Sequence, residues 1–241
     1  MKRFLAILQL LRIDACIPAF FALLVPVFLR TRNLALSFGR APPLLFICFC
    51  TFIANSLDDI EKDRINHPER PLPSCQLTPT FAAVLYFICL FSALFLVRRF
   101  VSERQDFWYY GLIALSISYR YVVECFPGLK AFYVAATASF LPLMIAAWYP
   151  GDARLYLVVA FAFLVITGTE MCMDIRDRAG DPISFMHKFG PKAVAIFAFS
   201  LEALGLLLLL TQIRKPSELV DLLAMASVLA VACLYWFRRA N

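Results

Sequence analysis

The strongest constraint on the fold is a series of long apolar runs separated by short polar segments. Crossing a bilayer as a helix takes about 20 apolar residues, and the runs approach that length. They are continuously apolar and do not alternate as barrel strands do, and an open sheet would leave backbone groups unpaired in lipid. We therefore predict an all-α polytopic membrane bundle of about eight transmembrane helices. The eight runs are 15–29, 41–57, 81–97, 107–123, 131–149, 155–173, 193–213 and 219–237.

The composition excludes several classes of protein. Of 241 residues, 62% are hydrophobic and 17% charged, whereas a soluble domain is about half apolar and a quarter charged. This argues against a soluble enzyme, a disordered chain and a nucleic-acid-binding domain. Eight passes occupy the whole length, so we expect one integral-membrane domain over residues 1–241. With eight cysteines but no C-x-x-C pair, and only two histidines, we expect neither a disulfide framework nor a Cys or His metal centre.

The distribution of basic residues predicts the orientation in the membrane. The net charge is +6, and most Lys and Arg residues lie between the apolar runs. An even number of passes places both termini on one side, which then carries 14 of the 23 basic residues. Positive charge favours the cytoplasmic side. We therefore expect a cytoplasmic N-terminus, with the loops 58–80 and 174–192 on the same cytoplasmic face.

The first of these loops begins with a spaced set of oxygen-bearing side chains. Asn55, Asp59 and Asp63 follow one another at i, i+4 and i+8. On one helix such residues advance by about 40° per step and share a face. Because they begin inside an apolar run, they are costly unless they meet a cation or line a wet cavity.

The second loop repeats this pattern with four carboxylates. Glu170, Asp174, Asp177 and Asp181 stand at i, i+4, i+7 and i+11, so on a helix they fall within about 60° of one another. Like charges stacked in this way repel, and divalent cations would remove the repulsion. The alternative is a solvated acidic face paired with neighbouring Lys and Arg side chains.

These donors suit a hard cation. Carboxylates without Cys or His favour Mg²⁺, which in proteins commonly bridges a few carboxylates to substrate phosphate oxygens. An apolar bundle beneath the acids would fit a lipid with a diphosphate head. Cations available near the acids as phosphate partners are Lys62, Arg64, Arg70, Lys130, Arg176, Arg178 and Lys188.

Both acidic segments resemble signatures of the UbiA superfamily of intramembrane prenyltransferases. The pattern N-x-x-x-D-x-x-x-D-R-I-N at 55–66, followed by R-P-L-P-S at 70–74, is similar to the first signature. The segment 170–181 is similar to the second, aspartate-rich signature. Weaker similarities occur at Arg12, 128–131 and 188–190. The resemblance implies a helical membrane bundle around a central cavity.

The resemblance also implies a reaction and a set of site residues. Two Mg²⁺ ions would hold an allylic isoprenyl diphosphate, whose ionisation gives a carbocation that an acceptor captures. The metal ligands of the family map onto two triads, Asn55, Asp59 and Asp63 for one ion and Asp174, Asp177 and Asp181 for the other. The residues mapped onto diphosphate contacts are Arg64, Arg70 and Lys130.

Some features depart from the family pattern. The family usually has nine membrane helices, and its Tyr-x₃-Lys element is absent because Val123 follows Tyr119 at that spacing. We predict a Mg²⁺-dependent prenyltransferase acting on an aromatic or lipid-soluble acceptor. The alternative is a membrane terpene cyclase that uses the same metal site without an acceptor. A CDP-alcohol phosphotransferase lacks support because the chain has no D-G-x-x-A-R element. An ion carrier is disfavoured because the acids cluster at one face.

Overall fold

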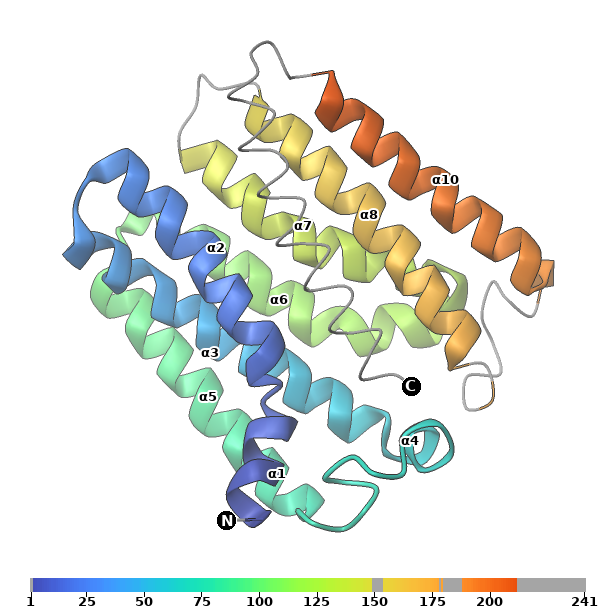
Figure 1. Cartoon of the computed structure of the whole chain (residues 1–241). Helices are drawn as coiled ribbons and strands as arrows, with labels where there is room; N and C mark the ends of the chain where they lie inside the picture. The colour runs from blue at the N-terminus through green and yellow to red at the C-terminus, as the bar shows by residue number, and fades with distance from the viewer. Residues whose placement is uncertain (1, 149–153, 178, 180–187, 212–241) are drawn as a thin grey trace.

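The chain folds into an all-helical bundle, as predicted. The computed structural model describes residues 2–148, 154–177, 179 and 188–211, and every regular element in these ranges is helical. In chain order the helices are α1 Lys2–Leu10, α2 Ile13–Thr31, α3 Leu34–Asp58, α4 Ile60–Asn66, α5 Pro79–Phe100, α6 Glu103–Cys125, the short 3-10 helix η1 Pro127–Leu129, α7 Lys130–Trp148, α8 Arg154–Arg176 and α10 Pro191–Leu210 (Figure 1).

Seven of the eight predicted apolar runs form long helices. Six of these are long and apolar enough to cross a membrane: α2, α3, α5, α7, α8 and α10. Helix α6 is equally long but carries Glu103 and Asp106 in its first turn and Arg120 and Glu124 near its end, which makes it more polar. The eighth run, 219–237, lies outside the described residues.

The long helices run up and down in two groups. Helix α3 contacts α2, α5 and α6, while α8 lies between α7 and α10. Contacts of α7 with α2 and α6 join the groups (Figure 1). Because successive long helices are antiparallel, one end of the bundle carries α1, α4, η1, the end of α8 and the start of α10 (Figure 1). We call this the acidic end of the bundle. The opposite end carries the α2–α3 and α5–α6 junctions and the end of α7.

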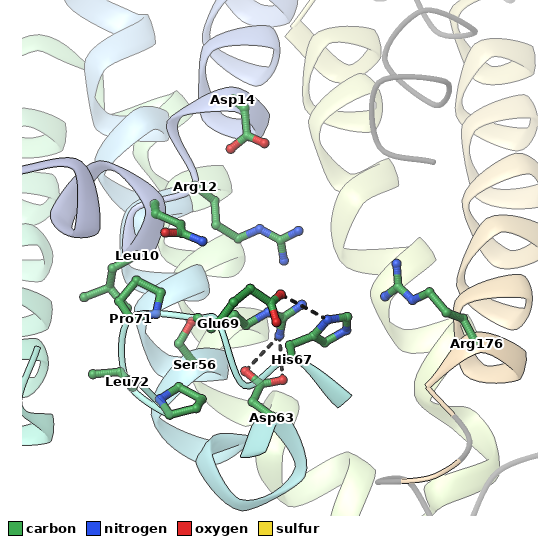
Figure 2. A pocket seen from close by; sticks show the side chains of 13 residues that line it. Leu10, Arg12, Asp14, Ser56, Asp63, His67, Glu69, Pro71, Leu72 and Arg176 are labelled. Atoms are coloured by element: carbon green, nitrogen blue, oxygen red, sulfur yellow. Dashed lines mark hydrogen bonds and ion pairs between the residues drawn. The ribbon is translucent and has the colours of Figure 1, made fainter. Parts of the chain in front are cut away.

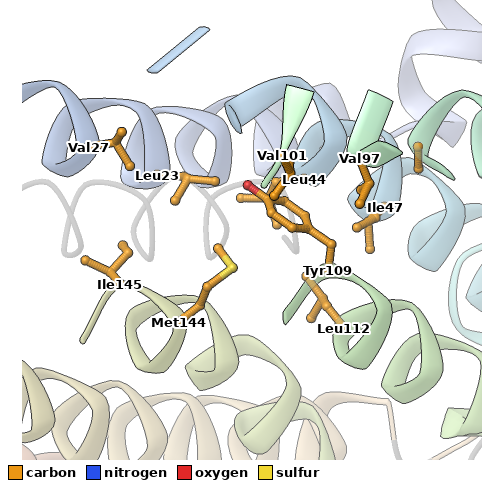
Figure 3. Packing of buried hydrophobic residues seen from close by; sticks show 11 residues of the cluster. Leu23, Val27, Leu44, Ile47, Val97, Val101, Tyr109, Leu112, Met144 and Ile145 are labelled. Atoms are coloured by element: carbon orange, nitrogen blue, oxygen red, sulfur yellow. The ribbon is translucent and has the colours of Figure 1, made fainter. Parts of the chain in front are cut away.

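A buried cluster closes the opposite end (Figure 3). Tyr109 of α6 is fully buried there, and its hydroxyl donates a 2.7 Å hydrogen bond to the backbone oxygen of Arg40 in α3. Side chains from five helices surround it, including Leu23 of α2, Leu44 of α3 and Met144 of α7. The apolar interior is thus filled with side chains at this end.

The first acidic segment departs from the continuous helix that its spacing predicted. Helix α3 ends at Asp58, and Asp59 leaves the helical conformation with φ −96° and ψ 11° before α4 begins. The i to i+4 backbone hydrogen bonds nevertheless continue, from Asp59 N to Asn55 O at 2.9 Å and from Asp63 N to Asp59 O at 2.7 Å. Helix α8 contains Glu170 and Asp174 and ends at Arg176, and Asp177 N still donates to Met173 O at 2.9 Å, whereas Asp181 lies outside the described residues.

We expect the contact between α8 and α10 to depend on Gly168. A Cβ atom there would lie 2.7 Å from the backbone oxygen of Ala198 and 2.8 Å from Cγ of Glu202. Gly168→Ala should therefore cost about 1–3 kcal/mol of stability, measured by thermal unfolding in detergent.

Gly39→Ala is the matched control, because the nearest atom to its new Cβ would be 3.5 Å away. It should be neutral or mildly stabilising, since Ala favours the helix. Equal unfolding temperatures for the Gly168→Ala variant and the wild type would contradict the close approach of the two helices.

Candidate active site

A polar cavity of about 120 Å³ opens at the acidic end of the bundle (Figure 2). It is lined by the α1–α2 junction, the end of α3, α4 with the loop behind it, and the end of α8. Its charged side chains, with one histidine, are Arg12, Asp14, Asp63, His67, Glu69, Arg70 and Arg176. A charged cavity at the end of an apolar bundle can bind a ligand with an anionic head and an apolar tail.

Asp63 and Arg70 form the ion pair at the centre of this lining. Arg70 Nη1 donates to both carboxylate oxygens of Asp63, at 2.6 and 2.8 Å. The Asp63 side chain is only 6% exposed. Burial raises the pKa of Asp63 above its ordinary value, although the hydrogen bonds and charge of Arg70 act in the opposite direction. Burial therefore makes the ionised carboxylate dependent on a cationic partner, which in this structure is Arg70.

The loop after α4 is shaped so that Arg70 points back to Asp63. Arg70 N donates to His67 O at 3.1 Å, Ser74 N to Arg70 O at 3.0 Å, and Leu77 N to Pro71 O at 3.1 Å. The side chains of Leu72 and Leu77 are buried in the core cluster beneath. The prolines of the R-P-L-P-S segment restrict the backbone, so the sequence itself favours this fixed loop.

A second set of contacts joins the two acidic segments. Asn66 Nδ2 donates to the backbone oxygen of Asp177 at 2.9 Å, and His67 Nε2 lies 3.3 Å from Asp177 Oδ1. Arg176 also holds the Asp177 carboxylate, through Nε at 2.6 Å and Nη2 at 2.8 Å. Segments more than a hundred residues apart in the chain are thereby fixed side by side. We call the contacts of Asn66 and His67 with Asp177 the 66–177 latch.

The third pair connects α7 and α8. Lys130 Nζ lies 2.8 Å from Asp174 Oδ1, with the two side chains 23% and 7% exposed. Lys130 is the first residue of α7, directly after η1, and Asp174 lies in the last turn of α8. Below them a small core that includes Ala131 and Met171 packs the two helices together.

The remaining predicted site residues lie around this centre. Asn55 is half-buried in the last turn of α3. Asp59 is 3.2 Å from Lys62 Nζ. Arg64 turns to Glu61 at 2.8 Å on the exposed side of α4 and does not line the cavity. Asp181 lies outside the described residues.

The types of side chain at this site suit Mg²⁺, but in this structure the carboxylates are paired with cationic side chains. The acidic segments offer oxygen ligands, as a hard cation such as Mg²⁺ requires. Among the described residues, however, no three Asp, Glu, His or Cys side chains are close enough together to hold a metal ion. Asp63, Asp174 and Asp177 are each held by Arg or Lys instead. The donor chemistry fits Mg²⁺, and binding would require these carboxylates to exchange partners.

Three residues outside the predicted metal ligands and diphosphate contacts also line the cavity. Arg12 adopts a left-handed conformation at the α1–α2 junction, with φ 47°, and its guanidinium lies 5.1 Å from the Phe52 ring centroid. Burial and then the charge of Arg70 lower the pKa of Arg12 to about 10. His67 and Arg176 also line the cavity. Arg176 was among the cations expected near the acids and Arg12 showed a weak family similarity, whereas no sequence pattern singled out His67.

Comparison with known proteins identifies the family. The model of the UbiA prenyltransferase family matches residues 15–241, and the chain belongs to this family. It is 27% identical to a digeranylgeranylglyceryl phosphate synthase from Methanosphaera stadtmanae, over 83% of this chain and 75% of the relative. It is 26% identical to the enzyme of that name from Methanocaldococcus jannaschii, over 86% of this chain and 75% of the relative.

The fold is also found in a solved structure. That structure is described as "Structural and mechanistic insights into the biosynthesis of Digeranylgeranylglyceryl phosphate synthase in membranes". It superposes with a TM-score of 0.66 at 24% identity, covering 87% of this chain and 77% of the other. At this identity the likeness establishes the fold, which is that of an integral membrane protein.

The Lys130–Asp174 pair yields a stability prediction. Lys130→Met removes the cation that lies 2.8 Å from the buried Asp174 carboxylate, which should cost about 3 kcal/mol. Adding Asp174→Asn should recover most of that loss, because the charge that needed a partner is gone. Thermal unfolding of both single variants and of the double variant in detergent measures the coupling. Additive effects would contradict a direct pair.

The 66–177 latch and the ion pair with Arg176 give a pH dependence. Burial raises the pKa of Asp177, but hydrogen bonds from Arg176 and His67 outweigh it, so the net pKa lies well below its ordinary value. The ionised form is therefore favoured in the folded state, and its contribution is present above about pH 4 and lost as the pH falls further. In Asp177→Asn the unfolding temperature should fall less steeply with acid than in the wild type. Parallel profiles would contradict this assignment.

Proposed function

We propose that this protein is a Mg²⁺-dependent enzyme that transfers an isoprenyl group from an allylic diphosphate to a lipid-soluble acceptor and releases diphosphate. The observation that carries the proposal is the meeting of two acidic segments beside one polar cavity, which Asp63, Arg70 and Arg176 line. That cavity lies at the end of an apolar helix bundle. Membership of the UbiA prenyltransferase family supports the reaction class. We further propose that the acidic end faces the cytoplasm.

We propose that the two triads, Asn55, Asp59 and Asp63, and Asp174, Asp177 and Asp181, hold two Mg²⁺ ions. Bound there, the metal would offset negative charge that develops on the leaving diphosphate. The ion pairs suggest how the chain's own groups take part. Arg70 and Lys130 hold Asp63 and Asp174 in this structure, and both cations are available to diphosphate once the carboxylates bind metal. The cations then stabilise the same leaving group electrostatically.

The apolar bundle has its own part in the reaction. Breaking the C–O bond of the substrate leaves an allylic carbocation, which water would capture. Capture by an acceptor hydroxyl forms the new C–O bond and releases one proton. Helices whose interior is packed with apolar side chains keep water away from this step.

For the acceptor, we propose a lipid that carries a glyceryl phosphate group, in preference to an aromatic acceptor. The relatives are named for making digeranylgeranylglyceryl phosphate. The cavity also contains Arg12 and Arg176 besides Arg70, so it has cationic side chains for more than one phosphorylated ligand. Arginine forks are well matched to phosphate oxygens.

The direct test is a reaction with the detergent-purified protein, Mg²⁺ and C15 or C20 allylic diphosphate, with and without a prenylated glyceryl phosphate lipid. We expect diphosphate release and a doubly prenylated lipid by mass spectrometry only when the acceptor is present. An aromatic product formed from an aromatic acceptor would overturn the acceptor class. A cyclic hydrocarbon formed without acceptor would make the protein a terpene cyclase instead.

Variants of the acidic triads test the site itself. Asp63→Asn and Asp174→Asn should each lower kcat/KM by about 100-fold or more, since each removes a charge that the leaving-group site requires. Glu61→Gln is the matched control, because Glu61 lies on the same short helix as Asp63 with its side chain 79% exposed. Retention of the wild-type rate by either Asn variant would overturn the two-segment site.

Arg64→Ala tests the predicted diphosphate contact in the same assay. If Arg64 binds the diphosphate, this variant should have a higher KM for the allylic diphosphate than the wild type.

A further inference from the structure

An arginine inside the membrane-spanning part of α3 lies far from the active site. Arg40 is six residues from the start of α3, about 9 Å along the helix from the opposite end of the bundle. Its backbone oxygen accepts the Tyr109 hydrogen bond, and its guanidinium carbon lies 5.0 Å from the Trp148 ring centroid. The side chain is thus held against an aromatic ring at the end of α7.

This arginine differs from the cations at the acidic end because no carboxylate pairs with it among the described residues. Its Nε is buried and has no hydrogen-bond partner, and the same is true of the indole nitrogen of Trp148. A buried donor left without an acceptor costs about 1–3 kcal/mol. Two such donors on neighbouring side chains, one of them cationic, favour an anionic acceptor at this place.

The surroundings favour a lipid headgroup as that acceptor. Arg30, Arg32, Arg98 and Arg99 lie at the helix ends of the same end of the bundle. Exposed apolar side chains, including Phe38 at 51% and Phe107 at 64%, lie near the starts of α3 and α6 at this end. Basic residues attract anionic lipids, a guanidinium fork matches phosphate oxygens, and apolar side chains at the rim can contact acyl chains.

We propose that Arg40 and Trp148 form a binding site for the phosphate of an anionic phospholipid at the end of the bundle opposite the active site. The Arg40 guanidinium binds the phosphate, and stacking on Trp148 holds the guanidinium plane. The site is separate from the cavity that binds substrate, so it stabilises the fold and takes no part in the transfer reaction.

The test is native mass spectrometry and thermal unfolding of the whole protein in detergent, with phosphatidylglycerol or phosphatidylcholine added. The wild type should retain phosphatidylglycerol and unfold at a higher temperature with it than with phosphatidylcholine. Arg40→Gln should bind phosphatidylglycerol at least about tenfold more weakly and lose the shift. Trp148→Phe, which keeps an aromatic ring but removes the N–H, should bind with intermediate affinity.

Arg99→Gln is the matched control, because Arg99 is a basic residue of the same end whose guanidinium carbon lies 5.5 Å from the neighbouring Phe100 ring centroid. It should bind phosphatidylglycerol like the wild type. An equal loss in Arg99→Gln would overturn the site in favour of general charge attraction, as would unchanged binding in Arg40→Gln. If inorganic phosphate alone produced the same shift, the lipid assignment would be wrong. Should Arg40→Gln fail to fold, full retention of phosphatidylglycerol by folded Trp148→Phe and Arg40→Lys would overturn the proposal.

Discussion

The arrangement of the acidic end depends on one electrostatic requirement: carboxylates at the end of an apolar bundle must be neutralised. Asp63 and Asp174 are almost fully buried, and each is held by a cation from another part of the chain. A buried charge without a partner is strongly destabilising. Each pair therefore also fixes a segment in place. Arg70 fixes the loop after α4, and Lys130 fixes the start of α7.

The same requirement links stability to function. On our proposal the carboxylates bind metal and the cations bind phosphate oxygens, and in this structure these two kinds of group pair with each other. The 66–177 latch keeps the two segments together while their side chains are paired in this way. Ligand binding on our proposal is an exchange of partners within a preformed end of the bundle, so only a local rearrangement of side chains is required.

The positions of the long helices could be predicted well from the sequence, and the local backbone and side-chain contacts of the site less well. Apolar runs and the polar segments between them located seven long helices, because burial in lipid depends on the composition of each segment. The break at Asp59 was not predicted, since the spacing of Asn55, Asp59 and Asp63 agrees equally with a straight helix. The exposed position of Arg64 was not predicted, because the sequence does not show on which side of α4 its ion pair with Glu61 forms.

The sequence by itself determined that this protein is a membrane bundle with two acidic segments at one end, because hydropathy and residue spacing act locally along the chain. Only the tertiary structure decided which cation meets which acid and which residues share the cavity. Lys130 meets Asp174, and Asn66 meets Asp177, across separations that no local pattern encodes. Ion pairs and hydrogen bonds depend on distances in space, and those distances exist only once the helices are packed.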